Sequence, residues 1–207
     1  IMVWGKLNKY DKYKSEVENF ISVEDGFIRS VGLGGDLHSP LSLLFDRKGI
    51  HYDFSKSCDL EDLLQNRLVN KKELQRSKQL ITLLNKHKIS KYNLTNKNKL
   101  KFNDLCKKEK ILVLGQVETD NSMINGVLGN KISKSNFSLV SKVKEDFPNS
   151  YVIYKPHPDI EAGLRVRGEK DYLIKKLADF IANKNSLDDL FKQVDRVVVF
   201  TSLGGFE

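Results

Sequence analysis

The chain has 207 residues, of which 40% are hydrophobic and 30% charged, and it carries a net charge of +8. This length can bury one large hydrophobic core or two small ones. No apolar run approaches the roughly 20 residues that span a bilayer, and the first residues lack the basic flank of a signal peptide. The two cysteines, Cys58 and Cys106, show no metal-ligand spacing, which indicates a reducing compartment and neither a zinc site nor a disulfide.

The positive charge is concentrated in one segment. Between residues 66 and 110 there are 14 Lys and Arg against three Asp and Glu, an excess larger than that of the whole chain. Three interpretations stay open: a solvated helical surface, a surface attracted to anionic lipid headgroups, and a nucleic-acid-binding region. The last is the weakest, because only Tyr92 and Phe102 are present to stack on bases.

Short apolar runs separated by Gly and Asp predict strands in the first third of the chain. We expect strands at residues 1–4 and 20–23, a helix over 11–19, and a hairpin of 41–46 with 49–52 around Arg47-Lys48-Gly49.

Two helices are predicted in the middle of the chain. The first begins within residues 58–64, with Ser57 or Asp59 as its N-cap. The second covers residues 71–87 and carries an apolar stripe from Leu74 to Leu84. The Lys- and Asn-rich stretch that follows is predicted to be a connector.

The second half of the chain alternates strand and helix patterns. Strands are expected at 111–114, 151–154 and 197–200, and helical segments at 136–147, 172–181 and 186–193. This alternation predicts a parallel α/β sheet. The chain stops at Phe206-Glu207, where a further helix is expected to begin, so we expect the second domain to be incomplete.

Polar clusters follow the predicted strands at their carboxyl ends, which is where open parallel sheets bind ligands. Clusters from two α/β segments facing one another across a cleft would match the GT-B plan of nucleotide-sugar enzymes. We therefore predict an α/β, GT-B-like fold with an N-terminal domain over residues 1–66, a basic connector over 67–110 and a nucleotide-sugar domain over 111–207. The clusters comprise Glu24, Asp25 and Arg29; Gln116, Glu118, Asp120 and Ser122; Lys155, His157 and Asp159; and Thr201, Ser202 and Glu207.

Two of these clusters suit phosphate groups. In Lys155-Pro156-His157-Pro158 the prolines stiffen the turn, so that the imidazole can donate to a phosphate oxygen, although prolines also commonly end strands. The small-residue turn 201–205 offers backbone N–H groups to an anion, but such turns also cap ordinary helices. In contrast, Gly32-Leu33-Gly34-Gly35 lacks the third glycine of a dinucleotide fingerprint, so NAD binding is rejected.

Carboxylates are the candidates for chemistry. Glycosyl transfer passes through an oxocarbenium-like state, in which a carboxylate can act as nucleophile or move a proton. Glu24, Asp25 and Asp120 are positioned for such roles. The alternative for Glu24 and Asp25 is a turn, and for Asp120 it is the N-cap of the following helix.

Taken together, the motifs resemble the capsule β-Kdo transferases of the KpsC type. The resemblance runs through nearly the whole chain, and its pieces are short. They are Val3-Trp4-Gly5, the run from Glu24 to Gly34, Pro40-Leu41-Ser42-Leu43, Gly49-Ile50-His51-Tyr52-Asp53, Gly115-Gln116-Val117-Glu118, Lys155-Pro156-His157-Pro158-Asp159, Ala162-Gly163-Leu164-Arg165, and the run from Thr201 to Glu207.

The resemblance implies a metal-independent enzyme, without a cofactor, that transfers Kdo with retention from CMP-Kdo to a Kdo chain on phosphatidylglycerol. It also implies a location in the cytoplasm, at the surface of the inner membrane. By the same analogy Asp120 is the nucleophile, Glu24 or Asp25 the acid/base, and His157, Ser202 and Glu207 hold CMP. We place Gln116 and Lys155 with these donor-binding residues, and Arg29, Glu118 and Ser122 elsewhere in the cleft.

This chain departs from the family pattern at Asp120-Asn121-Ser122, where an acid followed by Ala-Ser is usual. Two other functions stay open. One is a GT-B enzyme that uses another CMP-sugar, such as CMP-sialic acid, and the other is a non-catalytic basic module that binds membranes or RNA. No binding of nucleic acid is expected of the transferase.

Overall fold

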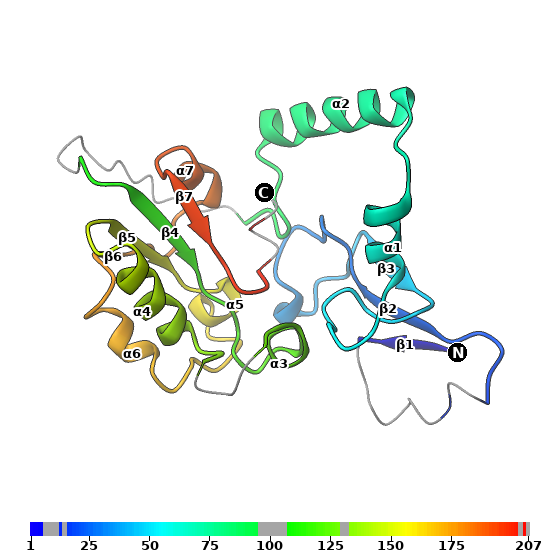
Figure 1. The fold of residues 1–207 in the computed structure, drawn as a ribbon, viewed down its shortest axis with the longest axis horizontal. Coiled ribbons are helices and arrows are strands. Elements are labelled where there is room, and N and C mark those ends of the chain that lie inside the picture. The colour runs from blue at the N-terminus through cyan, green and yellow to red at the C-terminus, as the bar shows by residue number, and fades with distance from the viewer. Residues whose placement is uncertain (6–12, 14–15, 95–106, 129–132, 203–204, 206–207) are drawn as a thin grey trace. The chain divides into compact units, whose positions relative to one another are not determined.

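The computed structural model describes residues 1–5, 13, 16–94, 107–128, 133–202 and 205. Contacts between these residues divide the chain into two compact units. The first unit comprises Ile1–Val31 and Ser39–Asn93, and the second comprises Gly32–His38 and Leu94–Glu207. Figure 1 labels the helices and strands of each unit.

The first unit is built on a small mixed sheet. Strand β1 (Met2–Trp4) pairs in parallel with β2 (Ile21–Asp25), and β2 pairs antiparallel with β3 (Leu43–Asp46). The strands predicted at residues 1–4 and 20–23 are thereby confirmed. The helix predicted over residues 11–19 falls largely outside the described residues.

The hairpin predicted between residues 41–46 and 49–52 is wrong, because β3 pairs with β2 and residues 49–52 form no strand. The side chain of Asp46 explains the difference. One of its carboxylate oxygens accepts the N–H of Gly49 at 2.7 Å, and the other accepts the N–H of Asp59 at 2.9 Å. These bonds turn the chain toward the next helix instead of back along the sheet.

Two helices complete the first unit. Helix α1 (Asp59–Asn66) starts at an N-cap that is neither of the two predicted residues: the sulfur of Cys58 accepts the N–H of Glu61 at 3.3 Å. Helix α2 (Lys71–His87) has the predicted bounds and begins with a capping box, in which Asn70 and Glu73 satisfy each other's backbone N–H groups.

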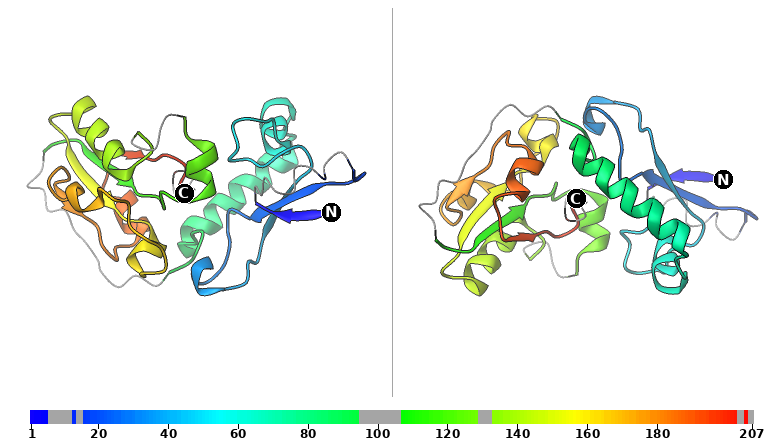
Figure 2. Two further views of the ribbon diagram at one scale, coloured as in Figure 1. Left: turned by 90° about the horizontal axis from the view of Figure 1, so that it is seen from below. Right: turned by 90° about the horizontal axis from the view of Figure 1, so that it is seen from above.

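The apolar stripe of α2 is exposed. No residue of this 17-residue helix is buried, and Leu74, Leu80 and Ile81 keep 50%, 47% and 56% of their surface accessible. Figure 2 shows α2 as the longest helix ribbon. None of the helices among the described residues is both long and apolar enough to cross a membrane.

The second unit contains a parallel sheet with the order β6-β5-β4-β7. Its strands are β4 (Lys110–Leu114), β5 (Tyr151–Lys155), β6 (Phe180–Ile181) and β7 (Arg196–Val198). Its helices are α3 (Asn121–Gly126), α4 (Asn136–Asp146), α5 (Pro158–Glu161), α6 (Asp171–Ile174) and α7 (Leu187–Phe191), with a 3₁₀ turn, η2, at Gly34–Asp36. The predicted parallel α/β sheet is confirmed.

Alternate residues of β4 fill two separate cores. Ile111 and Val113 face the apolar side of α4 and α6, whereas Leu112 and Leu114 face α7. All four are at most 4% exposed. Helices therefore cover both faces of the sheet, as a strand with a continuous apolar run requires.

The predicted helical segment 172–181 is only partly correct. Helix α6 ends at Ile174, and Phe180–Ile181 is the edge strand β6. Asp179 causes this change, since its backbone N–H donates to Val152 O and its carboxylate accepts the N–H of Val152, both at 2.8 Å. These bonds attach the segment to β5. The helix expected to begin at Phe206-Glu207 lies outside the described residues.

The predicted division into an N-terminal domain (1–66), a connector (67–110) and a nucleotide-sugar domain (111–207) stays a prediction. In the structure, α1 and α2 belong to the same compact unit as the first sheet. The glycine-containing segment Gly32–His38 belongs to the second unit, where Gly35 lies against Leu164.

Candidate active site

The sheet of the second unit has a topological switch point at β4. The chain passes from β4 to β5 on one side and later returns to β7 on the other side. Ligands of open parallel sheets bind in the crevice at the carboxyl ends of the strands at such a point. A ligand site is therefore expected at the loops that follow β4 and β7.

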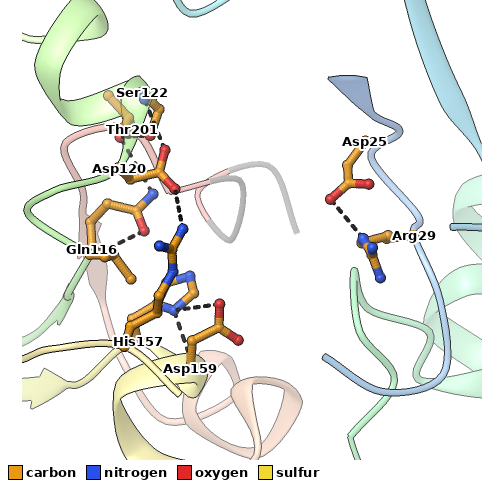
Figure 3. A network of polar contacts seen from close by, with 10 residues as sticks. Asp25, Arg29, Gln116, Asp120, Ser122, His157, Asp159 and Thr201 are labelled. Atoms are coloured by element: carbon orange, nitrogen blue, oxygen red, sulfur yellow. Dashed lines mark hydrogen bonds and ion pairs between the residues drawn. The ribbon is translucent and has the colours of Figure 1, made fainter. Parts of the chain in front are cut away.

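Side chains from these two loops are in contact. Ser122 Oγ lies 3.1 Å from Thr201 Oγ1, and Gln116 Nε2 lies 3.5 Å from the same oxygen. Figure 3 shows these three residues close to Asp120. The predicted clusters after β4 and β7 are thus brought together.

Asp120 combines a capping role with a partly exposed side chain. Its Oδ1 accepts the N–H of Ser122 at 2.8 Å and caps α3, so the capping alternative is confirmed. Its Oδ2 lies 4.0 Å from Arg165 Nη2, and the side chain is 37% exposed. The cap thus holds in place a carboxylate whose side chain is still partly exposed.

Asn136 positions the loop after β4. Its Oδ1 accepts the N–H of Gln116, and its Nδ2 donates to the carbonyl of Gln116, both at 2.9 Å. The N–H of Asn136 in turn donates to Glu118 Oε1 at 2.8 Å. Gln116 and Glu118, which we predicted as donor-binding and cleft residues, therefore also have structural partners. Asn136 itself was not predicted, because an Asn at the start of a helix has no distinctive spacing in the sequence.

Asp171 supports the same network from α6. It accepts from Asn136 Nδ2 at 3.4 Å and from the N–H of Gly168 at 3.2 Å. Burial raises the pKa of its carboxyl, and these two hydrogen bonds oppose that rise. The network therefore joins α4 and α6 to the site loop.

His157 lies at the N-cap of α5, on the stiff turn that the prolines predict. Its Nδ1 accepts the N–H of Asp159 at 3.2 Å, and the side chain is only 12% exposed. Because Nδ1 accepts, the proton of a neutral ring is on Nε2. This tautomer suits donation from Nε2 to an acceptor such as a phosphate oxygen. Figure 3 shows His157 and Asp159 on the same side of the unit as Asp120.

Lys155 has partners inside the fold. Its amine lies 3.2 Å from Glu161 Oε2 and 3.5 Å from the carbonyl of Ala182, and the side chain is 4% exposed. Burial lowers the pKa of the amine, and Glu161 opposes that effect. Glu161 also accepts the N–H of Lys184 at 2.8 Å. The amine thus braces the turn that carries His157, and its predicted contact with the donor stays a prediction.

Arg165 is a site residue that sequence reasoning did not single out. It lies after α5, and its guanidinium is directed at Asp120. Its four-residue segment, 162–165, was part of the family resemblance, but a single arginine after a short helix gives no chemical signal.

The predicted residues of the first unit form a separate pair. Arg29 Nε donates to Asp25 Oδ2 at 2.6 Å, and the two side chains are 7% and 18% exposed (Figure 3). Glu24 Oε1 accepts the N–H of Asp25 at 3.0 Å. Asp25 Oδ1 is buried with no hydrogen-bond partner among the described residues. One oxygen of Asp25 is therefore engaged by Arg29, which ties the acid to the loop after β2.

Two of the predicted CMP-binding residues are incompletely placed. Ser202 follows β7, and its carbonyl accepts the N–H of Gly205 at 3.1 Å. Glu207 lies outside the described residues. Within the described ranges no three His, Cys, Asp or Glu side chains converge as metal ligands. The expectation of a metal-independent reaction stays a prediction.

Comparison with known protein families identifies the chain. All 207 residues match the family model described as "Capsule polysaccharide biosynthesis protein". The chain belongs to this family. The family-level resemblance inferred from the sequence is confirmed.

Curated relatives in this family include LipA, a capsule polysaccharide modification protein of Neisseria meningitidis serogroup B, at 36% identity over 209 residues. The match covers 100% of this chain and 29% of LipA. The lipopolysaccharide-processing protein LpsZ of Rhizobium meliloti is 35% identical, over 89% of this chain and 42% of its own. The chain thus spans less than half the length of these relatives.

Two solved structures share the fold of this chain. The KpsC β-Kdo 2,4 transferase of Thermosulfurimonas dismutans has a TM-score of 0.83 and 27% identity, over 99% of this chain and 64% of that one. The β-Kdo 2,7 transferase of the same organism's KpsC has a TM-score of 0.70 and 33% identity, over 99% and 60%. These matches confirm the predicted GT-B-like α/β fold class.

Proposed function

We propose that this protein transfers Kdo, with retention, from CMP-Kdo to a Kdo chain carried on phosphatidylglycerol during synthesis of a capsule polysaccharide. Membership of the capsule family and the likeness to two Kdo transferases support the reaction class. The donor and the lipid acceptor are proposals that rest on this likeness. No metal or other cofactor takes part in the proposed reaction.

The observation that carries the proposal is the carboxylate of Asp120 at the switch point of the sheet. One of its oxygens is held by the cap on α3, the other is directed at Arg165, and the side chain is 37% exposed. A carboxylate held in one orientation is suited to act as a nucleophile. Its neighbours Ser122 and Thr201 supply hydroxyl groups for a sugar or phosphate.

Retention then follows from two displacements at the anomeric carbon. In the first, an oxygen of Asp120 bonds to that carbon as the bond to the phosphate oxygen breaks, and CMP leaves with the electron pair. In the second, the acceptor hydroxyl attacks the same carbon, the bond to Asp120 breaks, and the hydroxyl proton passes to a general base. Glu24 or Asp25 is the proposed base.

We assign CMP to the polar ends of β4, β5 and β7. The Nε2 proton of His157 is the proposed donor to a phosphate oxygen, and Gln116, Ser202 and Glu207 are proposed to contact the nucleotide. The contribution of Lys155 to the donor site is its support of the His157 turn, since its amine is paired with Glu161.

The decisive experiment compares Asp120→Asn with Asp146→Asn in the full-length protein. Asparagine is also a good N-cap, so Asp120→Asn keeps the helix start and removes the nucleophile. We expect Kdo transfer to fall on the order of 10³-fold or more, with an unchanged melting temperature. Asp146 pairs with Lys142 on the surface of α4, so its variant is expected to keep full activity. Undiminished transfer by Asp120→Asn would refute the role of Asp120 as nucleophile, whereas no transfer by the wild type would favour a non-catalytic module.

The donor is tested by ligand-induced stabilisation. A ligand at 100 times its Kd stabilises the folded state by about 2.7 kcal/mol, so CMP-Kdo is expected to raise the melting temperature. His157→Ala should reduce this shift for CMP and CMP-Kdo alike. A shift with CMP-sialic acid and none with CMP-Kdo would replace the proposed donor by the alternative one.

We further propose that the protein acts at the cytoplasmic surface of the inner membrane and that α2 takes part in this contact. Lys72 and Arg76 border the exposed apolar stripe of the helix, and Lys86 lies on the face away from it, so cations and apolar side chains are combined on one helix, as suits anionic headgroups. Co-sedimentation with vesicles of phosphatidylglycerol, but not with neutral vesicles, is expected. Charge reversal at Lys72 and Arg76 should abolish it, and equal binding of both vesicle types would contradict the proposal.

A further inference from the structure

Arg165 is placed next to Oδ2 of Asp120, the oxygen that does not cap α3. The two charged groups are 4.0 Å apart, and their side chains are 49% and 37% exposed. This separation is longer than a direct hydrogen bond between charged groups, which is normally about 2.7–2.9 Å. The half-exposed guanidinium therefore compensates the charge of the carboxylate without a direct hydrogen bond to it, so its N–H groups can be directed to a further partner.

The backbone that carries Arg165 is held on both sides. Gly163, at φ +76°, reverses the chain after α5, and the N–H groups of Leu164 and Arg165 then donate to the carbonyl of Asp159 at 2.8 and 3.2 Å. On one side Leu164 lies against Gly35. A fixed backbone with an accessible charged end is the arrangement expected of a ligand-binding side chain.

On the other side the chain approaches the loop after β4 closely. A Cβ at Gly168 would lie 2.3 Å from Glu118 Oε1, so only glycine fits there without displacing that carboxylate. The turn from Arg165 to Gly168 is thus packed directly on the loop that leads to Asp120. The position of the guanidinium is coupled to that of the proposed nucleophile.

The proposed donor sets a specific electrostatic problem. Kdo is a 2-keto sugar acid, so the anomeric carbon that Asp120 attacks also carries a carboxylate. The sugar carboxylate and the carboxylate of Asp120 are both negative and repel each other at bonding distance. This repulsion grows as water is excluded from the site. A cation beside the nucleophile is therefore needed to bring the sugar and Asp120 together.

We propose that Arg165 binds the carboxylate on the anomeric carbon of the donor sugar and so selects 2-keto sugar acids. A guanidinium suits this role, because its planar fork can hold a carboxylate with two parallel hydrogen bonds. The sugar carboxylate stays unchanged in the displacement, in which only the bond to phosphate breaks and the bond to Asp120 forms. This inference rests on the proposed function.

The test separates recognition of the sugar from recognition of the nucleotide. Binding of CMP and of CMP-Kdo is measured by calorimetry for the full-length wild type, Arg165→Gln and Arg165→Lys, with Arg167→Gln as a control from the same turn. For Arg165→Gln we expect CMP affinity to stay within about 2-fold and CMP-Kdo affinity to fall about 10- to 100-fold. For Arg165→Lys we expect a CMP-Kdo affinity between those of the wild type and Arg165→Gln. The control Arg167→Gln should bind both ligands as the wild type does.

Three results would overturn the inference. In the first, Arg165→Gln binds CMP-Kdo as well as the wild type does. In the second, it loses CMP and CMP-Kdo equally, which would place the guanidinium on the phosphate. In the third, it loses both ligands together with a lower melting temperature, which would make the residue structural.

Binding of CMP-sugars by the wild-type protein tests the proposed function separately. If it binds CMP-sialic acid and not CMP-Kdo, the Kdo assignment fails. Sialic acid is also a 2-keto sugar acid, however, so a selective loss of CMP-sialic acid in Arg165→Gln would still support the role of Arg165. If the wild type binds neither CMP-sugar, the proposed function and this inference fail together.

Discussion

Replacing Asn136 with alanine tests whether one amide holds the site loop in place. The side chain is fully buried, and its amide makes two hydrogen bonds of 2.9 Å to the backbone N–H and carbonyl of Gln116. Alanine removes the hydrogen-bond partner of both backbone groups. Gln116 is itself 8% exposed, so its backbone groups would be left without hydrogen bonds in the interior.

The expected magnitude follows from these two bonds. A buried polar group left unsatisfied costs about 1–3 kcal/mol, so the two groups of Gln116 together cost about 2–6 kcal/mol. For a protein of this size each kcal/mol lowers the melting temperature by about 2–4 °C. We therefore expect Asn136→Ala to lower the midpoint of urea unfolding at an unchanged slope and to weaken CMP binding.

Two further variants make the assay specific. Asn136→Asp keeps an acceptor for the N–H of Gln116 but directs a second oxygen at its carbonyl, so it should destabilise the protein as much as alanine does. Asn125→Ala removes a side-chain amide that donates to the carbonyl of Asn121 within α3, and it is expected to stay within about 0.5 kcal/mol of the wild type. An Asn136→Ala protein as stable as Asn125→Ala would refute the reasoning.

Three other predictions concern buried charge, a close contact and pH. Lys155→Met leaves Glu161 buried without its cation and should cost about 3–5 kcal/mol of unfolding free energy, much of it restored by adding Glu161→Gln. Gly168→Ala should displace the Glu118 carboxylate and cost more free energy of CMP-Kdo binding than free energy of unfolding. Burial lowers the pKa of His51 below its ordinary value, so the folded state binds fewer protons than the unfolded state. His51 therefore costs stability as the pH falls below about 6.5, and His51→Gln should be more stable relative to wild type at pH 5 than at pH 7.

Each of these predictions has a result that contradicts it. A Lys155→Met protein that is no less stable than wild type would mean that the pair with Glu161 is replaced by water. Wild-type affinity for CMP-Kdo in Gly168→Ala would show that Glu118 moves without consequence for the donor. A stability difference between His51→Gln and wild type that is the same at both pH values would show that the ring is hydrated in the folded state.

The sequence alone determined the features that depend on neighbouring residues. The run Ile-Leu-Val-Leu at β4 is apolar on both faces, which indicates a central parallel strand, and the capping pattern at Asn70 and Glu73 starts α2 at the predicted residue. The polar residues that follow the predicted strands include Asp120 and His157, which the fold places at the carboxyl ends of β4 and β5. These features could be predicted because propensity, capping and alternation act within a few residues of the chain.

The tertiary structure decided which distant groups meet. β3 pairs with β2 and not with the residues that follow it, because Asp46 turns the chain toward α1. The Lys155 amine is committed to Glu161, and Arg165 faces Asp120. Long-range contacts of this kind depend on how the sheet and its crossovers bring loops together, and a single sequence contains no pattern that specifies such a pairing.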